Sequence, residues 1–199
     1  GRGHKNIVAL FVGTGIGGGL ILNDSLYSGY RGMAAEIGHV TVNRGGIYCT
    51  GCGTQGCLEA YAGKVGLENR IENIATKGIN SILVDLVVAN NGKLKSSHIK
   101  TALEQQDDVA IDIISEAMEY LGVGIAGTIN MLNPSVVVLG GGVMEAVGLA
   151  YIDKIKRVVQ RNSYAPIFKD CDFKLAELGD NSGIYGAMEL VANKSYSYL

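Results

Sequence analysis

The glycine-rich stretch GTGIGGG, residues 13–19, limits the possible folds of this 199-residue chain more than any other stretch. One apolar run, residues 7–12, ends directly before it, and a second, residues 20–22, follows, which predicts a strand, a glycine-rich turn and another strand. The glycines also fit G-x-G-x-x-G, the pattern that opens a helix in dinucleotide-binding folds. No helix start follows here, and Glu36, at the distance of the expected ribose-binding acid, lies outside a βαβ unit. A dinucleotide site and a plain tight turn remain the alternatives to a phosphate-binding hairpin.

The composition is that of an ordinary globular protein, with 47% hydrophobic residues, 18% charged residues and a net charge of -2. This length suits one or at most two domains. The scattered Lys and Arg form no basic stripe, so nucleic-acid binding by this chain is not expected. No apolar stretch reaches about 18 residues, and the N-terminus lacks the apolar core of a signal peptide. We therefore expect a cytoplasmic location, no membrane partner and reduced cysteines.

Helical and strand patterns alternate along the rest of the chain. Apolar residues at helical spacing predict helices, and short apolar runs predict buried strands. The predicted helices cover residues 58–77, 82–89, 108–130, 143–161 and 183–192, and the predicted strands cover residues 135–139 and 173–178. Because no linker or internal repeat divides this mixture, we expect an α/β fold in a single domain over residues 1–199.

Three cysteines and one histidine lie within a stretch of 19 residues and form the strongest candidate for a metal site: His39, Cys49, Cys52 and Cys57. A Cys3His set binds Zn²⁺ in closed, tetrahedral, structural sites, and soft thiolates favour zinc over magnesium or calcium. We therefore predict a structural zinc ion with no open position for a catalytic water. A redox pair of Cys49 and Cys52, or ordinary reduced cysteines, are the alternatives.

Five motifs occur in an order that resembles the ROK family of bacterial sugar kinases and sugar-responsive repressors. They are GTGIGGG (13–19), EIGH (36–39), CLEAYAG (57–63), VVVLGGG (136–142) and GIYGA (183–187). The resemblance covers nearly the whole chain. It implies an actin-like and hexokinase-like ATPase fold, of the ribonuclease H-like type, with this chain as the C-terminal lobe and the cysteines in a zinc-binding loop.

The resemblance also implies a nucleotide site and a sugar site. Backbone N–H groups of the hairpin would approach ATP phosphates, which residues without side chains allow. The implied phosphate contacts are Thr14, Gly15, Gly17 and Gly18, and the implied adenosine-side loop is Gly140, Gly141 and Gly142. The implied sugar contacts are Glu36, His39 and Glu59, with His39 also on the zinc ion. Solvated carboxylates and a simple strand-to-helix turn are the alternative interpretations of the glutamates and of the second glycine run.

The sequence departs from the family pattern in two ways. Both Thr50 and Gly51 separate the first two cysteines, one residue more than is usual in the family, and zinc tolerates this spacing. The family's D-x-G-x-T phosphate loop and its Asn-Asp segment with the catalytic Asp are not found, and Asn23-Asp24 lies in a turn that is not equivalent. No catalytic residue is therefore assigned, and residues 1–199 alone are expected to lack meaningful kinase turnover.

Two classes of function follow from the resemblance. The first is the substrate- and nucleotide-binding half of an ATP- and Mg²⁺-dependent hexose kinase similar to glucokinase. The second is the effector-sensing and oligomerising half of a ROK transcriptional repressor, and a purely structural zinc module is a third alternative. The resemblance further implies a homo-oligomer with a hexose and ATP as ligands.

Overall fold

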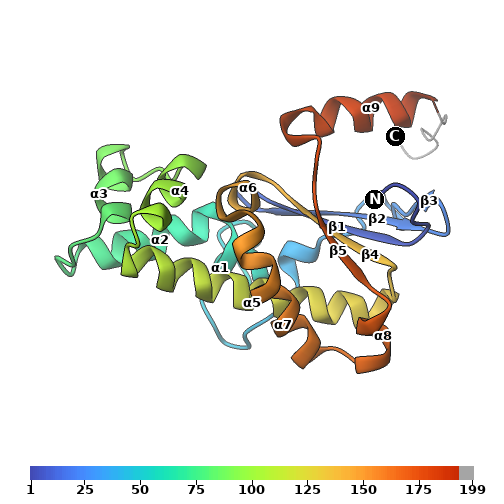
Figure 1. Ribbon diagram of the computed structural model, residues 1–199, viewed down its shortest axis with the longest axis horizontal. Coiled ribbons are helices and arrows are strands. Elements are labelled where there is room, and N and C mark those ends of the chain that lie inside the picture. Colours follow the sequence, from blue (N-terminus) through green and yellow to red (C-terminus); the bar gives the residue numbers. More distant parts are fainter. Residues whose placement is uncertain (193–199) are drawn as a thin grey trace.

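A computed structural model describes residues 1–192 and contains one five-stranded mixed sheet (Figure 1). In the order of the sheet, the strands are β3 (Ser25–Leu26), β2 (Ile16–Leu22), β1 (Ile7–Val12), β4 (Val136–Gly140) and β5 (Asp172–Leu175). β1 pairs antiparallel with β2 and parallel with β4, and β4 pairs parallel with β5. The predicted order of strand, glycine turn and strand is confirmed. The run Gly17–Gly19, however, lies inside β2 and not in the turn.

The main core lies between this sheet and a long helix, α5 (Asp108–Leu132). β1 alternates in burial, with Val8, Leu10 and Val12 fully buried, as expected for a strand with one face on the core. α5 packs against α7 (Ile152–Asn162), and both helices lie on the same side of the sheet (Figure 1). Gly122 permits this close packing, because a side-chain carbon there would lie 2.6 Å from Val158 Cβ.

Two predicted helices are wrong as single elements. Residues 58–77 form α1 (Leu58–Ala62) and α2 (Lys64–Ala75), separated by an extended Gly63. The break occurs because the backbone N–H groups that follow it bond to the glycine hairpin: that of Lys64 donates to the Gly13 carbonyl at 2.9 Å. The prediction for residues 143–161 was also wrong, because the chain forms α6 (Gly142–Val147), η2 (Gly148–Tyr151) and then α7. Gly148, with φ of 59°, interrupts the helical backbone there.

The other predicted elements are confirmed with small shifts at their ends. α3 (Ile82–Ala89) matches its predicted range, and α9 (Ser182–Ala192) begins one residue before its predicted start. The last strand is shorter than predicted and ends at Leu175. Residues 193–199 of the expected domain lie outside the described residues.

Three helical segments had no counterpart in the predictions. They are η1 (Ile37–His39), α4 (Ser96–Glu104) and α8 (Ala165–Lys169), and a further short turn, η3 (Gly179–Asn181), precedes α9. α4 packs against α6 and thereby comes close to the glycine turn that follows β4. Among residues 1–192, no helix combines the length and the apolar character needed to cross a bilayer.

Candidate active site and metal centre

Two glycine turns lie side by side at the carboxyl ends of the parallel strands β1 and β4. Phe11 and Gly140 are partners in the sheet register, which aligns the two strand ends. Gly141, with φ of 87°, approaches β1 so closely that a side-chain carbon there would lie 2.6 Å from the Val12 carbonyl oxygen. The carboxyl ends of parallel strands are where ligands bind in open α/β sheets. The predicted phosphate turn and the predicted adenosine-side loop therefore lie next to each other at this edge of the sheet.

The glycines of the hairpin, in the turn and at the start of β2, are required for different reasons. A side-chain carbon on Gly15 would collide with the Glu59 carboxylate, and one on Gly18 would collide with the Ala35 carbonyl oxygen. A side-chain carbon on Gly17 would meet no atom within 4 Å, and Thr14 is exposed. Packing within the chain therefore accounts for glycine at positions 15 and 18, whereas positions 14 and 17 face open space that a ligand can reach.

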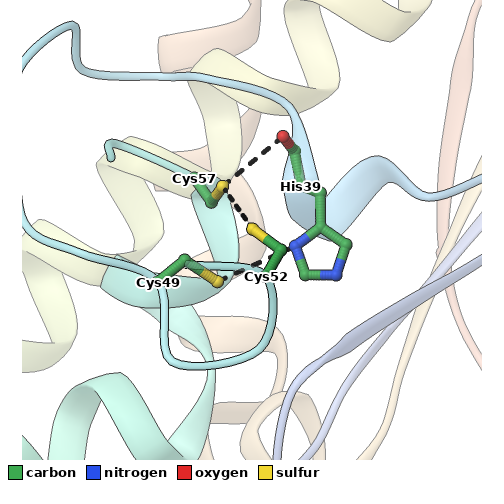
Figure 2. Close-up of side chains that lie close together, drawn as sticks. All are labelled: His39, Cys49, Cys52 and Cys57. Carbon is green, nitrogen blue, oxygen red and sulfur yellow. Dashed lines mark hydrogen bonds between the residues drawn. The ribbon is translucent and has the colours of Figure 1, made fainter. Parts of the chain in front are cut away.

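The four predicted metal ligands converge, as Figure 2 shows. The ligand atoms of His39, Cys49, Cys52 and Cys57 all lie within 4.8 Å of one another. The two sulfur atoms of Cys52 and Cys57 are 3.5 Å apart, and Cys49 Sγ is 3.7 Å from His39 Nδ1. Ligand atoms around a tetrahedral zinc ion, with bonds of about 2.3 Å to sulfur and 2.0 Å to nitrogen, are about 3.5–3.8 Å apart. The donor set and its spacing therefore fit a four-coordinate metal.

A tight loop presents the cysteines. The backbone N–H of Cys49 donates to the Thr54 carbonyl, and that of Gly53 donates to the Cys49 carbonyl, both at 2.8 Å. Isolated bridges join Tyr48 to Gln55 and Thr41 to Cys57, so the base of the loop is closed against the segment that carries His39. The extra residue between Cys49 and Cys52 is accommodated within this loop.

The environment affects the thiols differently. A hydrogen bond with the Thr54 hydroxyl lowers the pKa of the exposed Cys52 to about 6, because it stabilises the thiolate. Burial raises the pKa of Cys49 to about 11. The fourth cysteine, Cys171, is buried beside the start of β5, and burial raises its pKa to about 11 as well. All four cysteines are free thiols.

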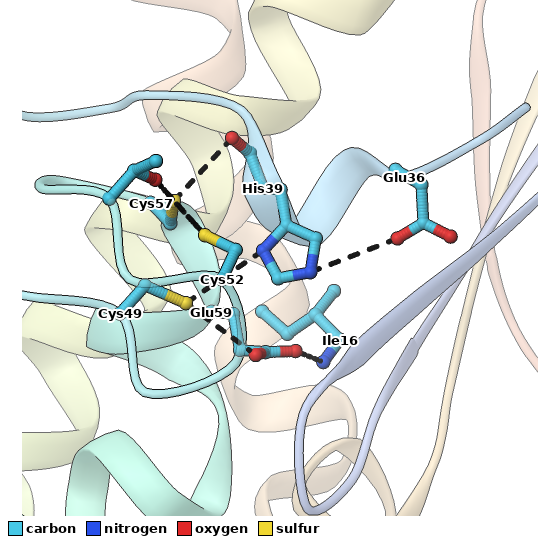
Figure 3. Close-up of polar contacts among 8 residues, drawn as sticks. Ile16, Glu36, His39, Cys49, Cys52, Cys57 and Glu59 are labelled. Atoms are coloured by element: carbon cyan, nitrogen blue, oxygen red, sulfur yellow. Dashed lines mark hydrogen bonds and ion pairs between the residues drawn. The ribbon is translucent and has the colours of Figure 1, made fainter. Parts of the chain in front are cut away.

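Glu59 connects the cysteine loop to the glycine hairpin (Figure 3). Its Oε2 accepts a hydrogen bond of 2.8 Å from the backbone N–H of Ile16, the first residue of β2. Its Oε1 lies 3.7 Å from Cys49 Sγ, which donates to it. The half-buried Glu59 is therefore not a solvated surface carboxylate.

His39 faces both predicted sites. Its Nδ1 points to Cys49, and its Nε2 lies 3.8 Å from Glu36 Oε2 (Figure 3). The Glu36 side chain is 63% exposed, so it is free to contact a ligand from solution. The three predicted sugar contacts, Glu36, His39 and Glu59, thus lie together at the edge of the glycine hairpin. Nε2 of His39 faces Glu36, and Nδ1 faces the thiols.

Tyr61 supports this arrangement and was missed as a functional residue in the sequence. Its hydroxyl accepts hydrogen bonds of 3.0 Å from Asn43 Nδ2 and from the backbone N–H of Ile47, at the base of the cysteine loop. Its ring stacks on Tyr120, with the ring centres 3.9 Å apart. In the sequence, the helical spacing of Tyr61 indicates only a core position. Its role could not be predicted because both hydrogen-bond partners of its hydroxyl lie in a preceding loop.

Comparison with known proteins relates this site to a family. Residues 1–194 match the model of the ROK family. A glucokinase of Halalkalibacterium halodurans is 35% identical in an alignment 201 residues long, and this alignment covers 99% of this chain and 59% of that protein. A xylose repressor of Caldicellulosiruptor bescii is 28% identical over 98% of this chain and 48% of the repressor.

The fold has solved counterparts as well. The crystal structure of a ROK family glucokinase from Streptomyces griseus, in complex with glucose and AMPPNP, matches with a TM-score of 0.80 and 33% identity. The match covers 95% of this chain and 61% of that one, so the chain spans less than two thirds of each of these relatives. The mixed α/β sheet is that of the actin-like ROK hexokinases. With a family match over residues 1–194 and relatives of this similarity, the chain belongs to the ROK family.

Proposed function

We propose that residues 1–199 form the substrate- and nucleotide-binding half of an ATP-dependent hexose kinase similar to glucokinase. The observation that carries this proposal is the position of Glu59, which holds the N–H of Ile16 in the glycine hairpin and lies in the same cluster as His39 and Glu36. A group that recognises sugar hydroxyls thus directly adjoins a turn suited to phosphates. The glucose and AMPPNP bound by the S. griseus glucokinase support the same pairing of ligands.

The site residues have separate roles in this proposal. Carboxylate oxygens of Glu36 and Glu59 accept hydrogen bonds from neighbouring hydroxyls of a hexose, glucose being the first candidate, and His39 Nε2 contacts a third hydroxyl. Backbone N–H groups of the hairpin bind the phosphates of Mg-ATP, and the second glycine turn lies against the adenosine. The phosphate contacts are Thr14, Gly15, Gly17 and Gly18, and the adenosine-side residues are Gly140, Gly141 and Gly142.

A zinc ion bound by His39, Cys49, Cys52 and Cys57 serves a structural role in the proposal. When bound, it cross-links the cysteine loop to η1, and four protein ligands leave no position open for water or substrate. Of the proposed sugar-binding side chains, His39 lies in η1, and Glu59 is contacted by Cys49 of the loop. The metal would therefore orient His39 and stabilise the position of Glu59 without taking part in phosphoryl transfer.

Phosphoryl transfer itself requires more than these residues. The reaction depends on a base for the attacking hydroxyl and on contacts that surround the transferred phosphoryl group. Residues 1–199 contain no D-x-G-x-T motif, and Asn23-Asp24 lies in the turn between β2 and β3. We therefore expect binding of both ligands by this chain and no meaningful turnover by this chain alone.

The effector-binding half of a sugar-responsive repressor is the second candidate, favoured by the 28% identity to the xylose repressor of C. bescii. The two candidates share a sugar site and differ in the need for nucleotide. Isothermal titration calorimetry of the purified chain with glucose and with AMPPNP separates them. Binding of both ligands supports the kinase half, binding of sugar without nucleotide supports the repressor half, and binding of neither favours a structural zinc module.

A matched pair of variants tests whether the sugar occupies the proposed site. Glu36→Gln removes a charged acceptor from the site and is expected to weaken hexose binding about tenfold. Glu72→Gln makes the same change on an exposed part of α2 and should leave hexose binding unchanged. Equal hexose affinity in the two variants would place the sugar elsewhere.

A further inference from the structure

Lys64 occupies a junction between the two glycine turns that the motifs do not assign. It is the first residue of α2, and its backbone N–H donates to the Gly13 carbonyl at 2.9 Å. The next N–H, that of Val65, donates to the Thr14 carbonyl at 3.2 Å. The start of α2 is therefore fixed against the phosphate-binding hairpin by its backbone.

The Lys64 side chain reaches the second glycine turn. A side-chain carbon on Gly142 would lie 3.0 Å from Lys64 Nζ and 2.5 Å from Ser96 Oγ. Lys64 Nζ donates a hydrogen bond of 3.0 Å to the same Ser96 hydroxyl, at the start of α4. One ammonium group is thus held over Gly142 by α4, while the backbone of the same residue is held by the hairpin.

The charge of Lys64 is not balanced within the described part of the chain. None of the ion pairs among residues 1–192 includes Lys64, although its side chain is half-buried. Removing an ammonium group from water is costly unless an anion accompanies it. The hydroxyl of Ser96 orients the group but supplies no negative charge. An anion that lies along the two glycine turns would complete this environment.

We propose that Lys64 binds the phosphate chain of the nucleotide and that Ser96 positions its ammonium group. This inference rests on the proposed nucleotide site and adds a charged contact to it. Because of this contact, the affinity of the chain for a nucleotide would depend on the phosphate groups of that nucleotide. In the proposed site, the backbone N–H groups of the hairpin hold the phosphates, and the second turn, at Gly142, lies against the adenosine. The phosphate chain of a nucleotide that spans both turns would therefore lie beside the Lys64 ammonium group. Lysine binds phosphate as a point charge, and the three ammonium protons serve Ser96 and the phosphate oxygens together.

The experiment compares ATP, ADP and adenosine by titration calorimetry, at low and high ionic strength, for the wild-type chain and Lys64→Met. We expect Lys64→Met to weaken ATP and ADP binding about tenfold or more and to leave adenosine binding unchanged. The loss should be larger at low ionic strength, because salt screens the attraction of Lys64 for phosphate. Lys64→Arg retains the charge and should restore most of the preference for ATP over adenosine.

Lys77→Met is the matched control. Lys77 is exposed just beyond the other end of α2, a helix about 18 Å long that begins at Lys64. This variant should bind all three ligands as the wild type does. Ser96→Ala should reduce the preference for ATP over adenosine less than Lys64→Met does.

The outcomes also separate this inference from the proposed function. A wild-type chain that binds ATP, together with a Lys64→Met variant that binds it equally well, overturns the role of Lys64 alone. Equal weakening of ATP and adenosine in Lys64→Met also overturns it, because Lys64 would then only maintain the shape of the site. A wild-type chain that binds no nucleotide overturns the proposed nucleotide site and this inference with it.

Discussion

The Glu59 carboxylate and the backbone N–H of Ile16 form a hydrogen bond of 2.8 Å that joins α1 to the glycine hairpin. The other oxygen of the same carboxylate accepts from the Cys49 thiol. A change in the cysteine loop can therefore reach the phosphate-binding hairpin through one side chain. In the proposed function, a zinc ion bound by the Cys49 thiolate would replace this thiol hydrogen bond, so metal binding would act on Glu59 and, through Glu59, on the hairpin.

Glu59→Ala and Glu59→Gln should separate the two roles of this residue. Glu59→Ala leaves the Ile16 N–H without its acceptor, and we expect about tenfold or greater losses of both hexose and nucleotide affinity. Glu59→Gln keeps an oxygen for Ile16 but lacks the charge, so hexose affinity should fall while nucleotide affinity changes little. Titration calorimetry with each ligand measures both effects. Loss of nucleotide affinity in Glu59→Gln to the extent seen in Glu59→Ala would contradict this division.

The cysteine cluster should hold one zinc ion per chain. Cys57 is fully buried in the cluster, and Cys57→Ser removes a ligand, so we expect loss of the metal and faster amide exchange in the loop from Ile47 to Cys57. Cys171→Ser changes a cysteine outside the cluster and should retain the metal. Elemental analysis and hydrogen exchange of freshly purified, reduced protein provide the measurements. Equal metal content in the two variants would exclude the cluster as the site.

Asp107 should make the stability of the fold depend on pH. Burial alone would raise the pKa of this carboxyl, but hydrogen bonds from Ala110 N–H, Leu83 N–H and the Ser81 hydroxyl outweigh burial and lower it. Because the folded pKa is the lower one, Asp107 stabilises the fold above its unfolded pKa of about 3.9. This contribution is lost as the pH falls below that value, through the folded pKa.

Urea unfolding at a series of pH values tests the role of Asp107. Asp107→Ala removes the N-cap of α5 and its bond to α3, and should cost about 2 kcal/mol near neutral pH. The difference from wild type should shrink as the pH falls below about 4. Asp108→Asn, at the exposed neighbouring position, should cost much less. A pH-independent difference between wild type and Asp107→Ala would refute the ionic contribution.

Ala35 has a left-handed backbone, with φ of 68°, directly before Glu36. This conformation costs a residue with a side chain about 1 kcal/mol, and glycine adopts it freely. We expect Ala35→Gly to stabilise the protein by up to about 1 kcal/mol, since the greater freedom of glycine in the unfolded chain offsets part of the gain. Ala34→Gly, where φ is not positive, should instead destabilise it. Thermal unfolding of both variants measures these opposite signs.

Local sequence patterns were sufficient for most elements and for the metal ligands. The apolar runs around GTGIGGG predict β1 and β2, and helical spacing from Asp108 predicts α5, because one buried face determines each pattern. The ligand spacing from His39 to Cys57 predicts a cluster, because so short a loop can bring these side chains together. Each of these patterns is local, because the residues that form it are close together in the sequence.

What the sequence alone determined is therefore the order of strands and helices, the glycine turns and the presence of a cysteine-rich cluster. Only the tertiary structure decided that the helical segment breaks at Gly63, that Glu59 holds Ile16 and that Lys64 reaches Gly142. The reason is physical. Each of these features depends on a backbone or side-chain group from a distant part of the chain, and only the packing of β1, β4 and the helices brings those groups within contact distance.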